Sequence, residues 1–347
     1  MSMDADSQFN NSREGSCDKN QYDVENKLPD TNCLIKGRQF SFAVGRQIAR
    51  GRMGAVYEVL RRSDGRCFAA KLEVCDAHFH GINMDYTILS QATKANCKHI
   101  TKLIDRGKIE GHFKFIVMSL LGDNLHKLRL TFVERHFSLS TALRLGIQTL
   151  AALNELHTLG FVHRDVKASN YALNGDRGPI VVYLIDFGLC RAYRNSEKEI
   201  KPARDKAQFR QVIWIYINDL YVEKNSKLGT TRYASVNAHN EMDLSPRDDL
   251  ESWFYMLIEM ICGFLPWSDL HKNERSEVKK MKEESRTHDG IQVLLKGCPK
   301  TEFRRILQYI DGLVYHSQPD YNFLTQLLQL AMKNNGLKMD DPYDWQE

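Results

Sequence analysis

The sequence predicts an α+β fold with two parts, a small part built on antiparallel strands and a larger, mainly helical part. Three observations predict it. Residues 34–71 hold short segments typical of strands, and apolar residues recur at helical spacing beyond Gly122. The composition, with 347 residues, 42% hydrophobic residues, 21 Gly and 8 Pro, is that of an ordinary globular protein rather than a low-complexity chain.

The first part contains alternating segments punctuated by a turn. The Ser63-Asp64-Gly65 sequence is typical of a hairpin turn. We expect strands over 40–44, 55–60, 67–72 and 113–118, and a helix over 83–93. These segments predict a small sheet with one main helix.

The second part contains two clear helical signals. Apolar residues at 139, 143, 147, 150 and 153 follow spacings of four and three, and Gly160 ends the pattern. The longest apolar stretch, 253–267, is interrupted by Glu259 and Gly263 and is shorter than the roughly 20 residues that a membrane helix needs. We therefore expect a buried core helix there, and no membrane partner.

Charge is unevenly distributed along the chain. Residues 1–32 carry seven acidic and three basic side chains, a net charge of −4, so the overall +4 leaves +8 on the remainder. Because this segment has few apolar residues, we expect residues 1–36 to form a disordered acidic tail.

The eight cysteines contain no C-x-x-C pair, and the chain opens without an apolar signal segment. These features predict a reducing compartment, namely the cytoplasm and also the nucleus.

The segment His163–Asn170 carries the strongest chemical signal. It reads HRDVKASN, and an apolar strand over 180–185 and then Asp-Phe-Gly at 186–188 follow it. Phosphoryl transfer needs a group that accepts or orients the substrate hydroxyl proton, and hard oxygen ligands for Mg²⁺. Asp165 suits the first role, Asn170 and Asp186 suit the second, and Lys167 can reach the transferring phosphate. The alternative is a polar loop with an Asp-Gly turn.

A glycine-containing segment upstream fits a flap over phosphates. It runs from Ile48 to Tyr57 and contains Gly51 and Gly54, where a Cβ would block close approach of the backbone to a nucleotide. Lys71 follows 17 residues after Gly54, in a strand where it would pair the α- and β-phosphates. The context has no βαβ unit, which excludes a dinucleotide-binding fold.

Together these motifs resemble the eukaryotic protein kinases. The strings GTTRYASVNAH at 229–239, RDDLES at 247–252 and LPW at 265–267 resemble the casein kinase I group. The HRDVKASN segment, NAH at 237–239 and PYDW at 342–345 resemble its tau-tubulin kinase branch, including the expanded nematode-type members. The resemblance covers about residues 37–347. It implies the bilobal kinase fold (37–120 and 121–347), ATP with Mg²⁺ as cofactors, a monomer, and transfer to Ser or Thr of protein substrates.

The resemblance also implies roles for single residues. Met118 would be the gatekeeper, and 119–121, ending at Leu121, would contact adenine through the backbone. Ile48, Val56 and Ala69 would sandwich the base, and Asp249 would anchor the catalytic loop. Arg232 would form a pocket for acidic or phosphorylated substrates, or else a local contact within its own segment.

Three departures from the family pattern bear on activity. Ala49 stands where the family has the leading flap glycine. Asp85 stands where it has the glutamate that pairs with Lys71. If the helix does not move, a pair stretched from about 4 to 5.5 Å would lose roughly 1 kcal/mol, whereas a small helix shift would erase that loss. We expect Asp85 to pair with Lys71 in the active state. Eighteen residues, Gln211–Leu228, interrupt the activation segment. They would form an extra strand pair or a partner-binding edge, or represent an unspliced segment.

Two classes of function compete. The leading hypothesis is an active serine/threonine kinase, favoured by Lys71, Asp165, Asn170 and Asp186. The rival is a catalytically weak pseudokinase that acts as a nucleotide-binding scaffold, favoured by the departures. Binding of nucleic acid through the basic body has no groove-reading motif behind it, so we expect no nucleic-acid partner.

Overall fold

The computed structural model describes residues 27–51, 53–75, 81–175, 178–204, 230–271 and 273–346. The chain divides into two compact units. Unit 1 contains the chain up to Gly122 together with 174–177 and 186–189, and unit 2 contains the remainder. The predicted insert Gln211–Leu228 and residues 1–26 of the predicted tail lie outside the described residues.

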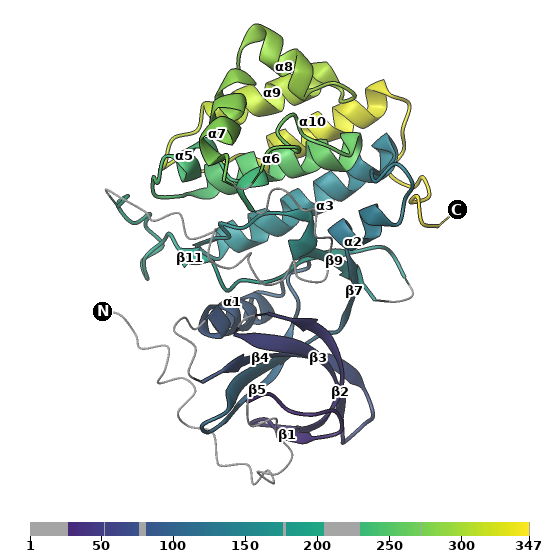
Figure 1. The fold of residues 1–347 in the computed structure, drawn as a ribbon, viewed down its shortest axis with the longest axis vertical. Coiled ribbons are helices and arrows are strands. Elements are labelled where there is room, and N and C mark those ends of the chain that lie inside the picture. Colours follow the sequence, from purple (N-terminus) through teal and green to yellow (C-terminus); the bar gives the residue numbers. More distant parts are fainter. Residues whose placement is uncertain are drawn as a thin grey trace. The chain divides into compact units, whose positions relative to one another are not determined.

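Unit 1 is built on a six-stranded antiparallel sheet in the order β1-β2-β3-β4-β6-β5 (Figure 1). Its elements are β1 (Leu34–Lys36), β2 (Ser41–Arg50), β3 (Gly54–Arg61), β4 (Cys67–Val74), α1 (Gly81–Lys94), β5 (Leu103–Ile109) and β6 (Phe113–Met118). The four predicted strands and the predicted helix are all present. Strands β1 and β5 were not predicted from the sequence.

The core of unit 1 corrects the predicted boundary of the tail. Leu28, Cys33 and Ile35 are buried in the cluster that fills one face of the sheet, and Ile35 lies opposite Phe42 where β1 pairs with β2. The prediction that residues 1–36 are disordered is therefore wrong for residues 28–36. The low apolar content of the whole segment hid the few apolar side chains that this edge strand buries.

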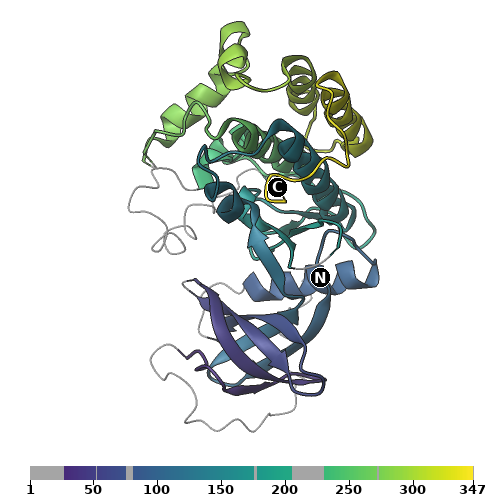
Figure 2. The ribbon, with the colours of Figure 1, turned by 90° about the vertical axis from the view of Figure 1, so that its right-hand side faces the viewer.

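Unit 2 is mainly helical (Figures 1 and 2). Its helices are α2 (Leu125–Leu130), α3 (Leu139–Thr158), α5 (Val236–His239), α6 (Pro246–Cys262), α7 (Arg275–Glu284), α8 (His288–Leu294), α9 (Lys300–Asp311) and α10 (Tyr321–Asn334), with short 3₁₀ turns η3 (Ala168–Asn170) and η5 (Thr230–Arg232). Short strands pair as β10 (Val182–Leu184) with β9 (Tyr171–Asn174), which also pairs with β7 (Leu121–Asn124), and as β11 (Arg191–Ala192) with β8 (Phe161–Val162).

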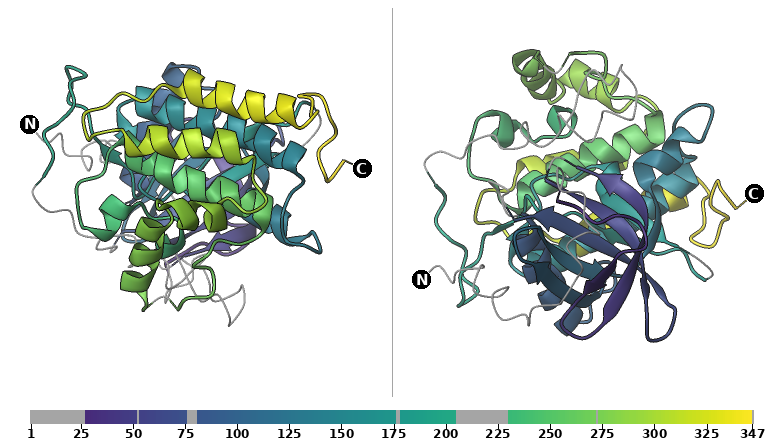
Figure 3. Two further views of the ribbon diagram at one scale, coloured as in Figure 1. Left: turned by 90° about the horizontal axis from the view of Figure 1, so that it is seen from above. Right: turned by 60° about the horizontal axis from the view of Figure 1, so that its bottom comes forward.

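Helix α6 forms the centre of unit 2. It packs on α3 and α9, α3 also packs on α10, and α10 lies beside α9 (Figure 3, left). All but two of its residues are buried, which confirms the predicted buried core helix. The helix begins earlier than the apolar stretch, at Pro246, because Asp248 Oδ2 accepts a hydrogen bond from Ser245 N at 2.9 Å and Pro246 occupies the first turn.

No helix among the described residues combines the length and the apolar character needed to cross a membrane.

Candidate active site

One face of the sheet in unit 1 gathers most of the predicted nucleotide-binding residues. Directly paired residues share a face, and so do residues two apart on one strand. Ala49 lies opposite Val56, Val56 opposite Lys71, and Ala69 opposite Met118. Since Ala69 is two residues from Lys71, all five side chains project from the same face. The opposite face carries the hydrophobic core, with Tyr57, Ala70 and Leu72 among its members.

Lys71 is at the centre of an ion-pair cluster on this face. Its Nζ lies 2.6 Å from Asp85 Oδ2 on α1 and 2.9 Å from Asp186 Oδ1. Asp85 Oδ1 also accepts a hydrogen bond from Phe187 N at 2.8 Å. The expected pairing of Asp85 with Lys71 is therefore present, and at 2.6 Å the pair is not stretched.

Burial and neighbouring charges shift the pKa values of this cluster in opposite directions. Burial lowers the pKa of Lys71, but the negative charges of Asp186 and Asp85 outweigh it and raise that pKa above its usual value. Burial raises the pKa of Asp85, and Lys71 opposes the change. We conclude that the lysine is charged. Half of the Asp186 side chain is exposed, in contrast to Asp85 at 3%, so Asp186 is the member that can meet a ligand.

A contact that was not predicted from the sequence holds the start of α1 in place. Glu73 on β4 is buried, and its Oε2 accepts a hydrogen bond from Ile82 N at 3.1 Å in the first turn of α1. The sequence signal that could have pointed to Glu73 was an acidic residue in the strand CFAAKLEV, where Lys71 is the other charged residue.

The predicted glycine flap is formed by the ends of β2 and β3. Gly51 N donates to Gly54 O at 2.9 Å, and Ile48 is 45% exposed beside a bulge in β2. A Cβ on Gly54 would lie 1.8 Å from Leu72 O. Gly54 is thus required by its own sheet neighbour, a reason that the sequence analysis did not give.

The predicted adenine-contacting segment follows β6. Met118 is the last residue of β6, and Leu121 is the first residue of β7. Both side chains are partly buried. The backbone of 119–120 joins the two strands without strand pairing of its own, as a segment that contacts a ligand through backbone groups requires.

Unit 2 holds the predicted catalytic loop. Asp165 is buried, and its Oδ2 lies 3.0 Å from Lys167 Nζ and 3.2 Å from Asn170 Nδ2. Asn170 Nδ2 also donates to the backbone oxygen of Asp165 at 2.8 Å. The other carboxylate oxygen, Asp165 Oδ1, is buried and accepts no hydrogen bond from the described residues. A buried, unpaired carboxylate oxygen is costly, and it suits a position kept for a substrate donor.

Asp249 anchors this loop from inside the first turn of α6. Its carboxylate accepts hydrogen bonds from His163 N at 2.6 Å, Arg164 N at 2.8 Å and His157 Nε2 at 2.8 Å. Burial favours a higher pKa for Asp249, but these bonds, that of His157 foremost, bring it below the usual value. The anchoring role that the resemblance implied is present, and the carboxylate holds Arg164 in a left-handed conformation with φ of 68°.

The two predicted Mg²⁺ ligands belong to different units, Asn170 to unit 2 and Asp186 to unit 1. Carboxylate and amide oxygens are ligands that Mg²⁺ prefers. Because the Asn170 amide nitrogen is engaged by Asp165, its carbonyl oxygen is turned away from that carboxylate and suits a cation. Among the described residues, no group of three or more His, Cys, Asp or Glu side chains forms a metal site by itself.

Arg232 contacts a buried carboxylate of unit 2. Its Nη1 lies 2.5 Å from Glu259 Oε1 on α6, and Trp267 Nε1 donates to its carbonyl oxygen at 2.8 Å. Glu259 also accepts from the Tyr233 hydroxyl. The predicted local contact is therefore present. Glu259 also lies 3.5 Å from Arg129 Nη2, so two arginines share this carboxylate, and the substrate-binding role of Arg232 stays a prediction.

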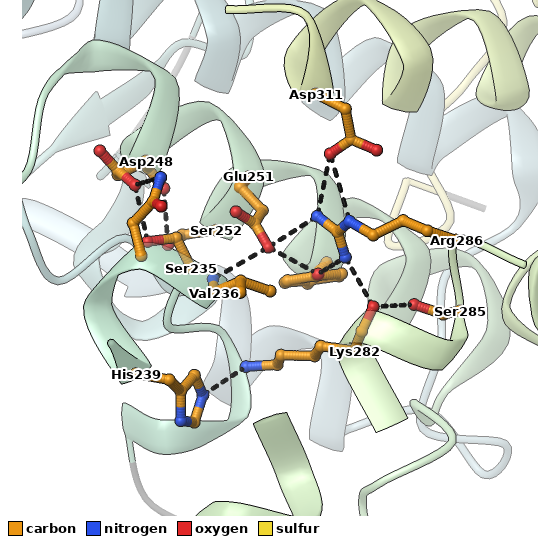
Figure 4. Close-up of polar contacts among 12 residues, drawn as sticks. Ser235, Val236, His239, Asp248, Glu251, Ser252, Lys282, Ser285, Arg286 and Asp311 are labelled. Atoms are coloured by element: carbon orange, nitrogen blue, oxygen red, sulfur yellow. Dashed lines mark hydrogen bonds and ion pairs between the residues drawn. The ribbon is translucent and has the colours of Figure 1, made fainter. Parts of the chain in front are cut away.

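A lysine that the sequence analysis did not single out fixes the same segment. The Lys282 side chain comes from α7, is fully buried, and donates to Thr231 O at 2.8 Å and Ala234 O at 2.7 Å. Its Nζ also lies 3.3 Å from His239 Nε2, as Figure 4 shows. Burial, followed by the positive charge of Lys282, lowers the pKa of His239 to about 3, so this ring is neutral and can accept.

An ion-pair network next to Lys282 joins α6 to the loop after α7. Arg286 Nη2 lies 2.9 Å from Glu251 Oε1 and 3.0 Å from Asp311 Oδ1 (Figure 4). Glu251 Oε1 also accepts from Val236 N at 3.1 Å, at the start of α5. Segment 230–239 is thus held by buried side chains of α6 and α7.

Comparison with known proteins places these observations in a family. Residues 42–334 match the family described as protein kinase domain. The chain is 34% identical over 315 residues to a probable serine/threonine-protein kinase of Dictyostelium discoideum, covering 90% of this chain and 57% of that protein. It is 33% identical over 324 residues to serine/threonine-protein kinase spe-6 of Caenorhabditis elegans, covering 92% of this chain and 79% of that protein.

Proposed function

Since the chain belongs to the protein kinase domain family, we propose that it is a serine/threonine kinase that transfers the γ-phosphoryl group of ATP to protein hydroxyls. One observation carries the proposal. Asp165 keeps one buried carboxylate oxygen without a hydrogen bond from the described residues, while Lys167 and Asn170 hold the other oxygen.

Each residue has a definite part in this reaction. Asp165 Oδ1 accepts the hydrogen bond of the substrate hydroxyl and takes up its proton as the oxygen attacks phosphorus. Lys167 places a positive charge two residues from the base, and Lys71 offers its ammonium to phosphate oxygens. Asn170 and Asp186 would hold Mg²⁺, which neutralises charge on the β- and γ-phosphates when bound.

The rival function, a weak scaffold, loses its main support in the structure. It rested on Ala49, Asp85 and the insert. Asp85 pairs directly with Lys71 at 2.6 Å, and Ala49 pairs with Val56 next to the bulge in β2. These contacts favour a competent nucleotide site.

The finer assignment is also a proposal. We place the chain in the casein kinase I group, in a tau-tubulin kinase-like branch, on its motifs at 163–170, 229–239 and 342–345. Acidic or already phosphorylated proteins are the proposed substrates, supported by the net charge of +8 outside residues 1–32. A monomer of the cytoplasm and nucleus is the proposed working form.

Transfer of labelled phosphate from ATP to casein tests the proposal. The full chain should label casein, and Asp186→Asn should not, because this substitution removes a carboxylate from the proposed Mg²⁺ site. Equal background labelling by both proteins, together with a nucleotide-induced thermal shift of the unsubstituted chain, would instead establish the scaffold.

A further inference from the structure

Two cysteines that the proposed reaction does not use lie in contact inside unit 2. Cys262 is the last residue of α6, and Cys298 lies just before α9. Their sulfur atoms are 3.7 Å apart, and Cys262 Sγ lies 3.0 Å from Lys296 O. From this geometry we propose that Cys262 and Cys298 form a redox modification site, in which a low-molecular-weight disulfide converts the two thiols into one disulfide.

The local backbone explains why the two sulfurs meet. Gly263 ends α6 in a left-handed conformation, with φ of 80°, and Gly297 is also left-handed, with φ of 93°. A Cβ on Gly297 would lie 3.3 Å from Cys262 Sγ, so the glycine lets the backbone approach that sulfur closely. A disulfide needs about 2.05 Å between its sulfurs, so closure requires the two side chains to move together by about 1.7 Å.

The two thiols have different parts in the reaction. Cys262 is partly exposed and Cys298 is buried. The hydrogen bond between them lowers the pKa of Cys262 and raises that of Cys298. Cys262 is therefore the thiol that meets the oxidant first.

The chemistry balances with glutathione disulfide as the oxidant. The Cys262 thiolate attacks one sulfur of glutathione disulfide, which forms a mixed disulfide and expels one glutathione thiolate. The Cys298 thiolate then attacks the Cys262 sulfur and expels the second. The two cysteines lose two electrons, one glutathione disulfide becomes two glutathione molecules, and the two cysteine protons pass to the expelled thiolates.

The disulfide would close a loop over the residues between the two cysteines. Residues 263–297 contain α7 and α8, and α7 carries the Lys282 that holds Thr231 and Ala234. A covalent link at the base of this segment restricts its unfolded state, and we expect the melting temperature to rise by about 5 °C. Excess reductant should reverse the rise.

The test uses the full chain in glutathione buffers of increasing oxidised fraction. Remaining thiols are alkylated, the protein is digested without reduction, and linked peptides are identified by mass spectrometry. The expected result is a Cys262–Cys298 linked peptide that appears with the rise in melting temperature. Cys67→Ser, at an exposed cysteine of unit 1, should leave both results unchanged, whereas Cys262→Ser should remove both.

The decisive comparison lies within the unsubstituted protein, so it does not depend on whether a variant folds. Glutathione attached to Cys67 with no linked Cys262–Cys298 peptide would overturn the proposal. So would a linked peptide no more frequent than links between other cysteines.

Discussion

Lys71 and Asp85 are in direct contact, with 2.6 Å between Nζ and Oδ2, although an aspartate reaches one methylene less far than the glutamate that the family resemblance implied at this position. Asp85 also receives the backbone N–H of Phe187. One short carboxylate therefore links β4, α1 and the segment that begins at Asp186. The side chain that departs from the family pattern fits the geometry around it.

We expect Asp85→Glu to give no gain in activity. Asp85 is buried, and adding a methylene to a packed site costs about 1–3 kcal/mol. The measurement is kcat/KM for ATP, with Asp64→Glu as a control because Asp64 belongs to an exposed pair with Arg61. A rise of more than about threefold for Asp85→Glu would show that the native aspartate is a handicap.

Asp249→Ala should lower the stability of the protein strongly. The substitution leaves the N–H groups of His163 and Arg164, and the His157 ring, without their acceptor in a buried site. The expected loss is about 3–5 kcal/mol of unfolding free energy, measured by urea denaturation. Asp289→Ala, at an exposed residue of α8, should change it by less than about 0.5 kcal/mol; equal effects of the two substitutions would contradict the anchoring role.

Lys282→Met should also destabilise the fold. It keeps the length of the side chain but removes the donors to Thr231 O and Ala234 O, for an expected loss of about 3 kcal/mol. Lys280→Met is the matched control, because Lys280 lies on the same helix with 63% of its side chain exposed. If both variants unfold at the same urea concentration, Lys282 does not hold segment 230–239.

His239 predicts a specific pH dependence. Its pKa is lowered to about 3 in the folded protein, against about 6.5 in the unfolded chain. The unfolded state therefore binds the extra proton between these values. The contribution to stability is complete above about pH 6.5 and is lost as the pH falls, by about 2 kcal/mol at pH 5.

The pH prediction is checked by comparing the native protein with His239→Gln, whose amide oxygen can still accept from Lys282. Between pH 7.5 and 5, the native protein should lose about 2 kcal/mol more unfolding free energy than the variant. His288→Gln, at an exposed histidine, should behave as the native protein does. Parallel pH curves for the native protein and His239→Gln would refute the assignment.

Local patterns predicted much of the fold. Alternation in 67–72 and 113–118, and spacings of three and four in α3, depend on residues close in sequence, and these elements were found. Strand β5 was missed because Asp105 and Gly107 interrupt its apolar pattern. The structure gives the reasons for both residues: Asp105 accepts from the backbone of Arg38, Gln39 and Phe40, and a Cβ on Gly107 would meet the Phe115 ring at 2.4 Å.

The candidate catalytic residues could be predicted from the sequence, but the side chains that position them could not. Asp165, Asn170 and Lys71 stand in short motifs that are legible without a fold. The partners Glu73, His157 and Lys282 stand in no recognisable motif. They meet α1, Asp249 and Thr231, respectively, only in the folded chain. The same holds for Glu259, which forms the local contact of Arg232.

The central claim is that Asp165 is the catalytic acceptor, and Asp165→Asn tests it most directly. An asparagine can keep an oxygen toward Lys167 and Asn170, but it turns an N–H donor to the place where Oδ1 would accept the substrate hydroxyl. Phosphate transfer from ATP to casein should fall by about 10²–10⁴-fold, with the ATP-induced thermal shift unchanged. A variant that binds ATP and keeps more than about a tenth of the native rate would contradict the account.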